Sequence, residues 1–167
     1  MRETDNWVDR FDAALRSVAQ HLGANIVLQA PFDLTPGQVF LLHLIKTEEH
    51  CTVSQLAEKM EVKPSAITVM LDRLESRRYI ERFRDQQDRR VVIVQLTETG
   101  SDVLQKIWNL RKRVVGYCLN QLDGEELTVF IQAFEKLARI AADLDVQQFI
   151  STINDEEKRG NRDGNHT

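Results

Sequence analysis

The stretch from residue 52 to residue 100 constrains the fold of this chain more than any other. Two segments there carry apolar residues at helical spacing, and only Glu61, Val62 and Lys63 separate them. Such a short gap between two amphipathic helices is typical of a helix-turn-helix corner. The apolar positions are Val53, Leu56, Ala57 and Met60 in the first segment and Ile67, Met70, Leu71 and Leu74 in the second.

A hairpin pattern follows the second helix. Residues 79–84 and 91–96 have the composition of strands, the second with a β-branched run, and residues 85–90 join them. The order helix, turn, helix, hairpin predicts a winged helix-turn-helix at about residues 34–100. The expected fold class is therefore mainly α with a small β-hairpin wing.

Capping patterns define two of the helix starts. Thr35 precedes Pro36 and has Gln38 three residues later, and Thr52 has Gln55 at the same spacing. Both patterns predict a capping box. The helix after Thr35 should run to about residue 47 and, being apolar on most sides, should form the buried centre of the domain.

Further helical patterns flank the winged helix-turn-helix. We expect helices at about residues 5–30 and, from a cap at Thr97, over about residues 98–150, with a turn near residue 123. Residues 154–167 lack apolar side chains and predict a disordered polar tail. We expect residues 1–153 to form one domain. The first helix carries its apolar stripe at Trp7, Phe11, Leu15, Val18, Leu22 and Ile26.

Composition fits a soluble protein of 167 residues, with 42% hydrophobic and 29% charged residues. No apolar run approaches the roughly 18 residues needed to span a bilayer, and the acidic start does not resemble a signal peptide, so we expect a cytoplasmic protein without a membrane partner. Net charge is −4, but residues 63–90 hold eight Lys or Arg against five Asp or Glu, which is +3 and leaves −7 elsewhere. A local basic patch suffices for binding double-stranded DNA.

The second helix of the corner has the composition of a major-groove reader. Its outer face has small residues at the N-terminal end, where a helix approaches bases most closely. Hydroxyls there can donate to phosphates or base edges, and small apolar groups can meet a thymine methyl. An ordinary surface helix would share this pattern, so the prediction of a DNA-reading helix depends on the helix before it and the hairpin after it. The candidate DNA-binding residues on this helix are Ser65, Ala66, Thr68, Val69 and Arg73.

The hairpin tip supplies a second group of candidates. Arg84, Asp88, Arg89 and Arg90 lie in or beside the loop between the two strands. An arginine at such a tip can enter the narrow minor groove of A·T-rich DNA, and a carboxylate can hold it in position. A solvated charged turn has the same composition, so the tripeptide at 88–90 is weak evidence alone.

The ordered set of motifs resembles the multiple-antibiotic-resistance regulator (MarR) family of bacterial winged helix-turn-helix transcription factors. The resemblance implies a homodimer with interlocked terminal helices, two readers on a pseudo-palindromic operator, and DNA contacts at Ser65, Thr68 and Arg90, with Asp88 supporting the arginine. The motifs are LTPGQ at 34–38, SQLAEKM at 54–60, PSAITVMLDRLE at 64–75, IERF at 80–83, DRR at 88–90 and LTETG at 96–100.

Four positions depart from the family's pattern. Glu61 and Arg78 stand where the family often has glycine, which implies a strain cost if those backbones are left-handed. Lys63 replaces the Ser or Thr that often caps the recognition helix, and Val69 replaces a frequent basic residue. The operator's base sequence therefore does not carry over from relatives.

The terminal helices have more apolar surface than a single reader can cover, which predicts an intertwined homodimer; an intrachain bundle is the alternative. The resemblance also implies a pocket for a small-molecule effector where these helices meet the reader, with Phe32, Phe40, His43 and Trp108 as candidate lining residues. Ordinary core packing would explain each of them equally well.

Cysteine and metal chemistry are minor alternatives. Cys51 stands near a helix start, which can lower a thiol pKa and suit a redox signal. Residues 48–51 include acidic, His and Cys side chains, but neighbours in sequence cannot easily converge on one ion, so we expect no metal and no cofactor.

The sequence bears on three classes of function. We expect a sequence-specific DNA-binding regulator, a homodimeric repressor released by a small-molecule or redox signal. The alternative is a winged-helix protein-interaction module without specific DNA binding. An enzyme is not expected, because the chain has no glycine-rich phosphate loop, nucleophile motif or paired carboxylates in a cleft.

Overall fold

The computed structural model describes residues 2–48, 51–85 and 91–153. The chain divides into two compact units, Met1–Tyr117 and Cys118–Thr167. The expectation of one domain over 1–153 stays a prediction beside this division, and the expected polar tail at 154–167 lies outside the described residues.

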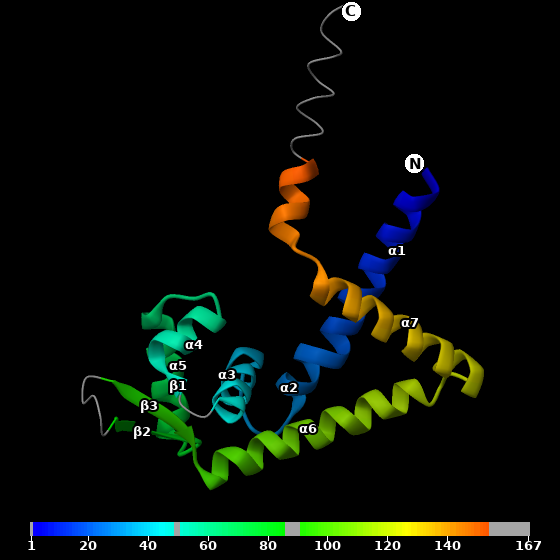
Figure 1. Cartoon of the computed structure of the whole chain (residues 1–167). Coiled ribbons are helices and arrows are strands. Elements are labelled where there is room, and N and C mark those ends of the chain that lie inside the picture. The colour runs from blue at the N-terminus through cyan, green and yellow to red at the C-terminus, as the bar shows by residue number, and fades with distance from the viewer. Residues whose placement is uncertain (1, 49–50, 86–90, 154–167) are drawn as a thin grey trace, which may run out of the picture. The chain divides into compact units, whose positions relative to one another are not determined.

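The first unit holds the reader and its flanking helices (Figure 1). Helices with a small antiparallel sheet confirm the predicted fold class. The elements are α1 (Arg2–Ala19), the π-helix η1 (Gln20–Ala24), α2 (Asn25–Gln29), α3 (Pro36–Thr47), β1 (Cys51–Thr52), α4 (Val53–Lys59), α5 (Pro64–Ser76), β2 (Ile80–Arg84), β3 (Val92–Leu96) and most of α6 (Glu98–Leu119).

Helix α3 is the centre of the hydrophobic core, as its sequence predicted. Its start has the expected capping box, in which the backbone N–H of Gln38 donates to Thr35 Oγ1 and the backbone N–H of Thr35 donates to Gln38 Oε1. Phe40 is an exception, because 48% of its surface is exposed. The core joins α3 to α4, α5, the sheet and the start of α6 through Leu41, Leu42, Ile45, Leu56, Ile67, Leu71, Leu74, Ile80, Val94, Leu104 and Ile107.

The predicted helix at 5–30 is present, but its hydrogen bonding changes along its length. Helices α1, η1 and α2 follow one another without a break, and η1 has π-helical geometry. A π-helical turn holds more residues than an α-helical turn. Nothing in the sequence pattern indicated this insertion, since the apolar stripe continues through it.

The sheet has three strands in the order β1-β3-β2, all antiparallel. The sequence predicted only the hairpin of β2 and β3, whose register pairs Ile80 with Leu96 and Arg84 with Val92. The additional strand, β1, has two residues and pairs Cys51 with Val94. A strand this short has no readable alternation, which is why the sequence did not reveal it.

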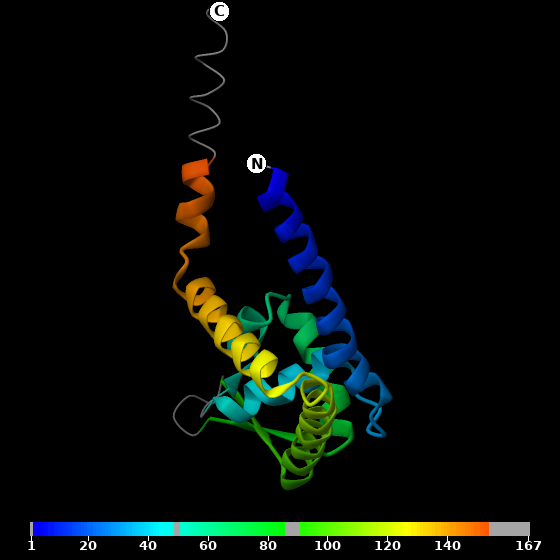
Figure 2. The same cartoon turned by 90° about the vertical axis from the view of Figure 1, so that its right-hand side faces the viewer.

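The sheet leads into α6, and in both views β3 runs directly to its start (Figures 1 and 2). Gly100, Val103, Leu104 and Ile107 of α6 are buried in the reader. In the second unit, α7 (Gly124–Asp143) begins with a capping box at Asp123, and residues 146–153 are again helical. No described helix is long and apolar enough to cross a membrane.

Candidate nucleic-acid interface

Helix α5 has one buried face and one exposed face, as a major-groove reader requires. Ile67, Leu71 and Leu74 are buried in the core. The predicted contact residues lie on the other side of the helix, and Val69 has 52% of its surface exposed. The exposed set comprises Ser65, Ala66, Thr68, Val69, Asp72, Arg73 and Ser76.

The start of α5 is open. Lys63 is the N-cap residue and makes no capping bond through its side chain, while Pro64 occupies the first turn. The absence of a cap matches the departure seen in the sequence. The first N–H groups of a helix that lack a side-chain cap form a positive end that favours an anion such as phosphate.

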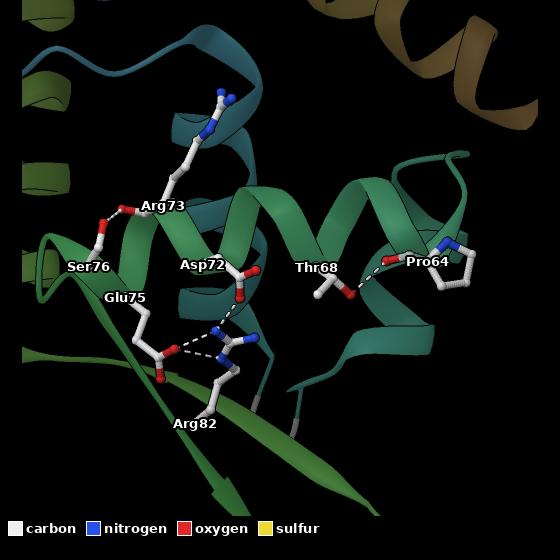
Figure 3. Close-up of polar contacts among 7 residues, drawn as sticks. All are labelled: Pro64, Thr68, Asp72, Arg73, Glu75, Ser76 and Arg82. Atoms are coloured by element: carbon white, nitrogen blue, oxygen red, sulfur yellow. Dashed lines mark hydrogen bonds and ion pairs between the residues drawn. The ribbon is translucent and has the colours of Figure 1, made fainter.

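The hydroxyl of Thr68 is not a free donor. Thr68 Oγ1 donates to the Pro64 carbonyl oxygen at 3.0 Å, so in this rotamer only its acceptor lone pairs face outward (Figure 3). We expected Ser65 and Thr68 to donate to DNA, and the geometry leaves this role to Ser65 unless the Thr68 rotamer changes.

Arg73 points away from the acidic side of α5. Its side chain forms no ion pair with another residue of the described ranges, and its carbonyl oxygen accepts a 2.8 Å hydrogen bond from Ser76 Oγ (Figure 3). An unpaired guanidinium on the exposed face is available to a phosphate or a guanine edge.

On the other side of α5, Arg82 of β2 contacts two carboxylates of the helix. Its Nη2 donates to Asp72 Oδ1 at 2.5 Å, and its Nε donates to Glu75 Oε2 at 3.0 Å (Figure 3). A further bond joins Nη2 to Glu75. The hydrogen bonds that Arg82 donates, first to Glu75 and then to Asp72, raise the pKa of Arg82. This contact was not predicted from the sequence, although two carboxylates three positions apart on a helix, followed by an arginine in the next strand, are a readable signal.

A second arginine holds the C-terminal end of α5. Arg77 Nη1 donates to the Phe32 carbonyl oxygen at 3.2 Å, and the guanidinium also bonds the carbonyl and carboxylate oxygens of Asp33. Asp33 has a left-handed backbone, with φ 49°. The loop that leads into α3 is therefore fixed to the end of the recognition helix.

Two other left-handed residues are those that the sequence marked. Glu61, between α4 and α5, has φ 53°, and Arg78, after α5, has φ 59°. Non-glycine residues adopt this conformation at a cost. These turns are therefore strained at the two positions where the sequence departs from glycine.

The wing is only partly within the described residues. Arg84 ends β2 and is exposed, and the Asp85 amide continues the hairpin by donating to the Val91 carbonyl oxygen at 3.0 Å. The predicted tip residues Asp88, Arg89 and Arg90 lie outside the described residues, so their role stays a prediction.

The candidate effector residues separate into two groups. Phe40, His43 and Trp108 line a cavity of about 270 Å³ together with Arg111, and the His43 and Trp108 rings lie 5.0 Å apart. Phe32 does not line this cavity but packs against the hydrophobic core.

Cys51 does not have the environment of a reactive thiol. It is 2% exposed, and burial, followed by the nearby Glu48, raises its pKa, while Lys59 acts in the opposite direction. The direction is therefore opposite to the lowering that a nearby helix start can produce. Within the part of the chain that the structure describes, no group of three or more His, Cys, Asp or Glu could hold a metal ion; Glu49 and His50 lie outside that part.

An exposed second helix and an attached antiparallel wing define a winged helix-turn-helix of the kind found in regulators of transcription. The sequence profile of the MarR family matches residues 34–92. The chain is similar to the HTH-type transcriptional repressor MdtR of Bacillus subtilis (strain 168), with 38% identity over 162 residues, which is 96% of this chain and 99% of that protein. This chain therefore belongs to the MarR family of transcriptional regulators.

Two solved structures agree with this assignment. A MarR family protein from Bacillus stearothermophilus matches with a TM-score of 0.71 and 28% identity, over 83% of this chain and 98% of that chain. The YusO protein of Bacillus subtilis matches with a TM-score of 0.66 and 31% identity, over 84% and 98% of the two chains.

Proposed function

We propose that this chain is a homodimeric, non-enzymatic repressor that binds a pseudo-palindromic operator by inserting α5 into the major groove. The exposed, small and polar outer face of α5 carries this proposal. A similar protein, MdtR, is named a transcriptional repressor. Because the proposed target is double-stranded DNA, we place the protein in the cytoplasm.

The candidate DNA-binding residues that the structure describes divide into those that would contact bases and those that would contact phosphates. Ser65, Thr68 and Val69 lie on the exposed face, where they reach base edges if α5 enters the groove. Arg73 and Arg84 are exposed and have no ion-pair partner among the described residues, so they are free to bind phosphates. The same docking would bring the tip, with Arg90, to the minor groove.

Dimerisation is supported by exposed apolar stripes in both units. On α1, Trp7, Phe11 and Leu15 are 59%, 44% and 43% exposed, and on α7 Phe130 and Phe134 are 45% and 49% exposed. Monomeric proteins rarely leave contiguous apolar faces in water. A second copy of the chain would cover both stripes and supply the two readers that a palindrome needs. A monomer by light scattering at micromolar concentration would contradict this assembly.

The cavity beside Trp108 supports release by a small molecule. Its lining is mostly apolar, with His43 and Arg111 as polar groups, which suits a small ligand with an apolar body. Small molecules that bind this cavity can be found by their effect on Trp108 fluorescence, measured in a Trp7→Phe variant so that Trp108 is the remaining tryptophan. Burial of Cys51 argues against that thiol as the signal receiver.

The test is selection of duplexes from a randomised library by the full chain, followed by anisotropy titration at several salt concentrations. We expect a short inverted repeat bound by one dimer, with affinity falling steeply as salt rises. Weak binding that ignores sequence would contradict the proposal. A salt-insensitive protein partner would favour the alternative, a protein-interaction module.

A further inference from the structure

We propose that Arg82 shields the charge of Asp72 on the exposed face of α5, so that a helix with net negative charge can approach the phosphates. Arg82 is then a positioning residue of the reader and not a DNA contact. The inference rests on the proposed function, because a shield matters only if α5 docks on DNA.

The charge of α5 creates the need for a shield. The helix contains one cation, Arg73, and two anions, Asp72 and Glu75, so its own charge is −1. Asp72 lies on the exposed face with 58% of its side chain accessible. A like charge brought against the phosphates would weaken binding strongly. The basic character of the reader must therefore come from residues outside this helix.

Arg82 is placed to cancel this charge. Two bonds to Glu75 fix the plane of the guanidinium, and a third, of 2.5 Å from Nη2, reaches Asp72 Oδ1 (Figure 3). Only 22% of the Arg82 side chain is exposed, so the cation lies behind the two carboxylates. Within the described ranges its Nη1 has no hydrogen-bond partner, and its backbone is paired with β3 at Val94.

Stability alone does not explain the arrangement. Asp72 and Glu75 are exposed enough for water to screen both pairs, and ion pairs of this kind contribute little to the free energy of unfolding. Their effect on an approaching phosphate is larger, because Asp72 and any phosphate docked on this face lie within a Debye length of about 8–10 Å.

The test is a double-mutant cycle on a duplex selected by the native chain. We expect Arg82→Gln to weaken binding about ten-fold or more, since it leaves the exposed Asp72 carboxylate without its shield. Adding Asp72→Asn should restore most of the loss. Asp72→Asn alone should bind at least as tightly as the native chain and needs no change of fold. Arg16→Gln on α1 removes an equal charge far from α5 in sequence and should change affinity little.

Each result decides between roles. Arg82→Gln could also weaken binding, lower the slope of log affinity against log salt by about 1, and not be rescued by Asp72→Asn. In that case Arg82 contacts a phosphate and the shield is wrong. If Asp72→Asn alone loses specific binding, Asp72 reads a base and the shield is also wrong. Unchanged binding by Arg82→Gln overturns the shield and leaves the proposed function intact. A native chain that selects no duplex overturns both.

Discussion

Gly100 lies against the backbone of Tyr79 so closely that a Cβ at residue 100 would stand 1.9 Å from the Tyr79 carbonyl oxygen. Thr97 makes the same junction polar, because its amide donates to that oxygen at 3.1 Å and its Oγ1 donates to the Arg78 carbonyl oxygen at 2.6 Å. The start of α6 is thereby attached to the chain between α5 and β2. A bulkier residue at 100 would separate the long helix from the reader.

Gly100→Ala should therefore lower the free energy of unfolding by about 2–4 kcal/mol, because overpacking against backbone cannot be relieved by a rotamer change. Urea melts followed by circular dichroism measure it. Gly37→Ala is the matched control, since the nearest atom to its Cβ is Met70 Cε at an ordinary 3.5 Å. Equal stability of the two variants would mean that the Gly100 contact relaxes freely.

The left-handed backbone at Arg78 predicts a reversal of the usual preference for alanine. Arg78→Gly should be more stable than Arg78→Ala by about 1 kcal/mol, because only glycine adopts φ near 59° without strain. At Ser76, the last residue of α5, the backbone is helical and the order should be opposite, with Ser76→Ala more stable than Ser76→Gly. The four variants are compared by urea melts. The same order at both sites would contradict the assigned backbone of Arg78.

The missing cap of α5 predicts a stabilising substitution. Lys63→Ser should raise the free energy of unfolding by about 0.5–1 kcal/mol, because a serine oxygen can accept from an N–H of the first turn. Lys63→Ala removes the same cation without supplying a cap and is the control. If both variants melt at the same denaturant concentration, the first turn of α5 already has partners in water that a serine does not improve.

Local signals carried much of the fold. Features that a few neighbouring residues determine were predicted correctly. They are the capping boxes at Thr35 and Thr52, the cap at Thr97 and the short turn before α5. The exposed face of α5 was equally readable, because helical period alone decides which side is apolar.

The features that were missed depend on distant neighbours. Arg77 reaches residues 44 and 45 positions away, and Arg82 meets α5 only after the chain has reversed direction. The need for glycine at 100 arises from a carbonyl oxygen of Tyr79. Only the Arg82 contact leaves a trace in the sequence, the charge pattern of Asp72, Glu75 and Arg82. The others leave none, since each is set by packing between elements.

The two cysteines should differ in reactivity. Cys118 is exposed and Cys51 is buried with a raised pKa, so a maleimide should label Cys118 rapidly and Cys51 only after unfolding. A Cys118→Ser chain should stay unlabelled until denaturant is added, as mass spectrometry would report. Rapid labelling of Cys51 in the native chain would mean that this thiol is accessible, and would make it a candidate redox sensor again.

The raised pKa of Cys51 also makes stability depend on pH. The contribution of this thiol to the free energy of unfolding should be present below its pKa in the unfolded chain and lost as pH rises through its pKa in the folded chain.

Val69 provides a test of which base feature α5 reads. Its side chain is half exposed between Ser65 and Asp72, and an isopropyl group can contact a thymine methyl but cannot form a hydrogen bond. Replacing each thymine of the selected duplex in turn by deoxyuridine should weaken binding of the native chain at one position per half-site, by about 0.8 kcal/mol or roughly four-fold, the cost of one methyl contact. With Val69→Ala the same replacement should cost little. A loss of equal size in both chains would move the methyl contact to another residue, such as Ala66, and would leave Val69 without a part in selecting the operator.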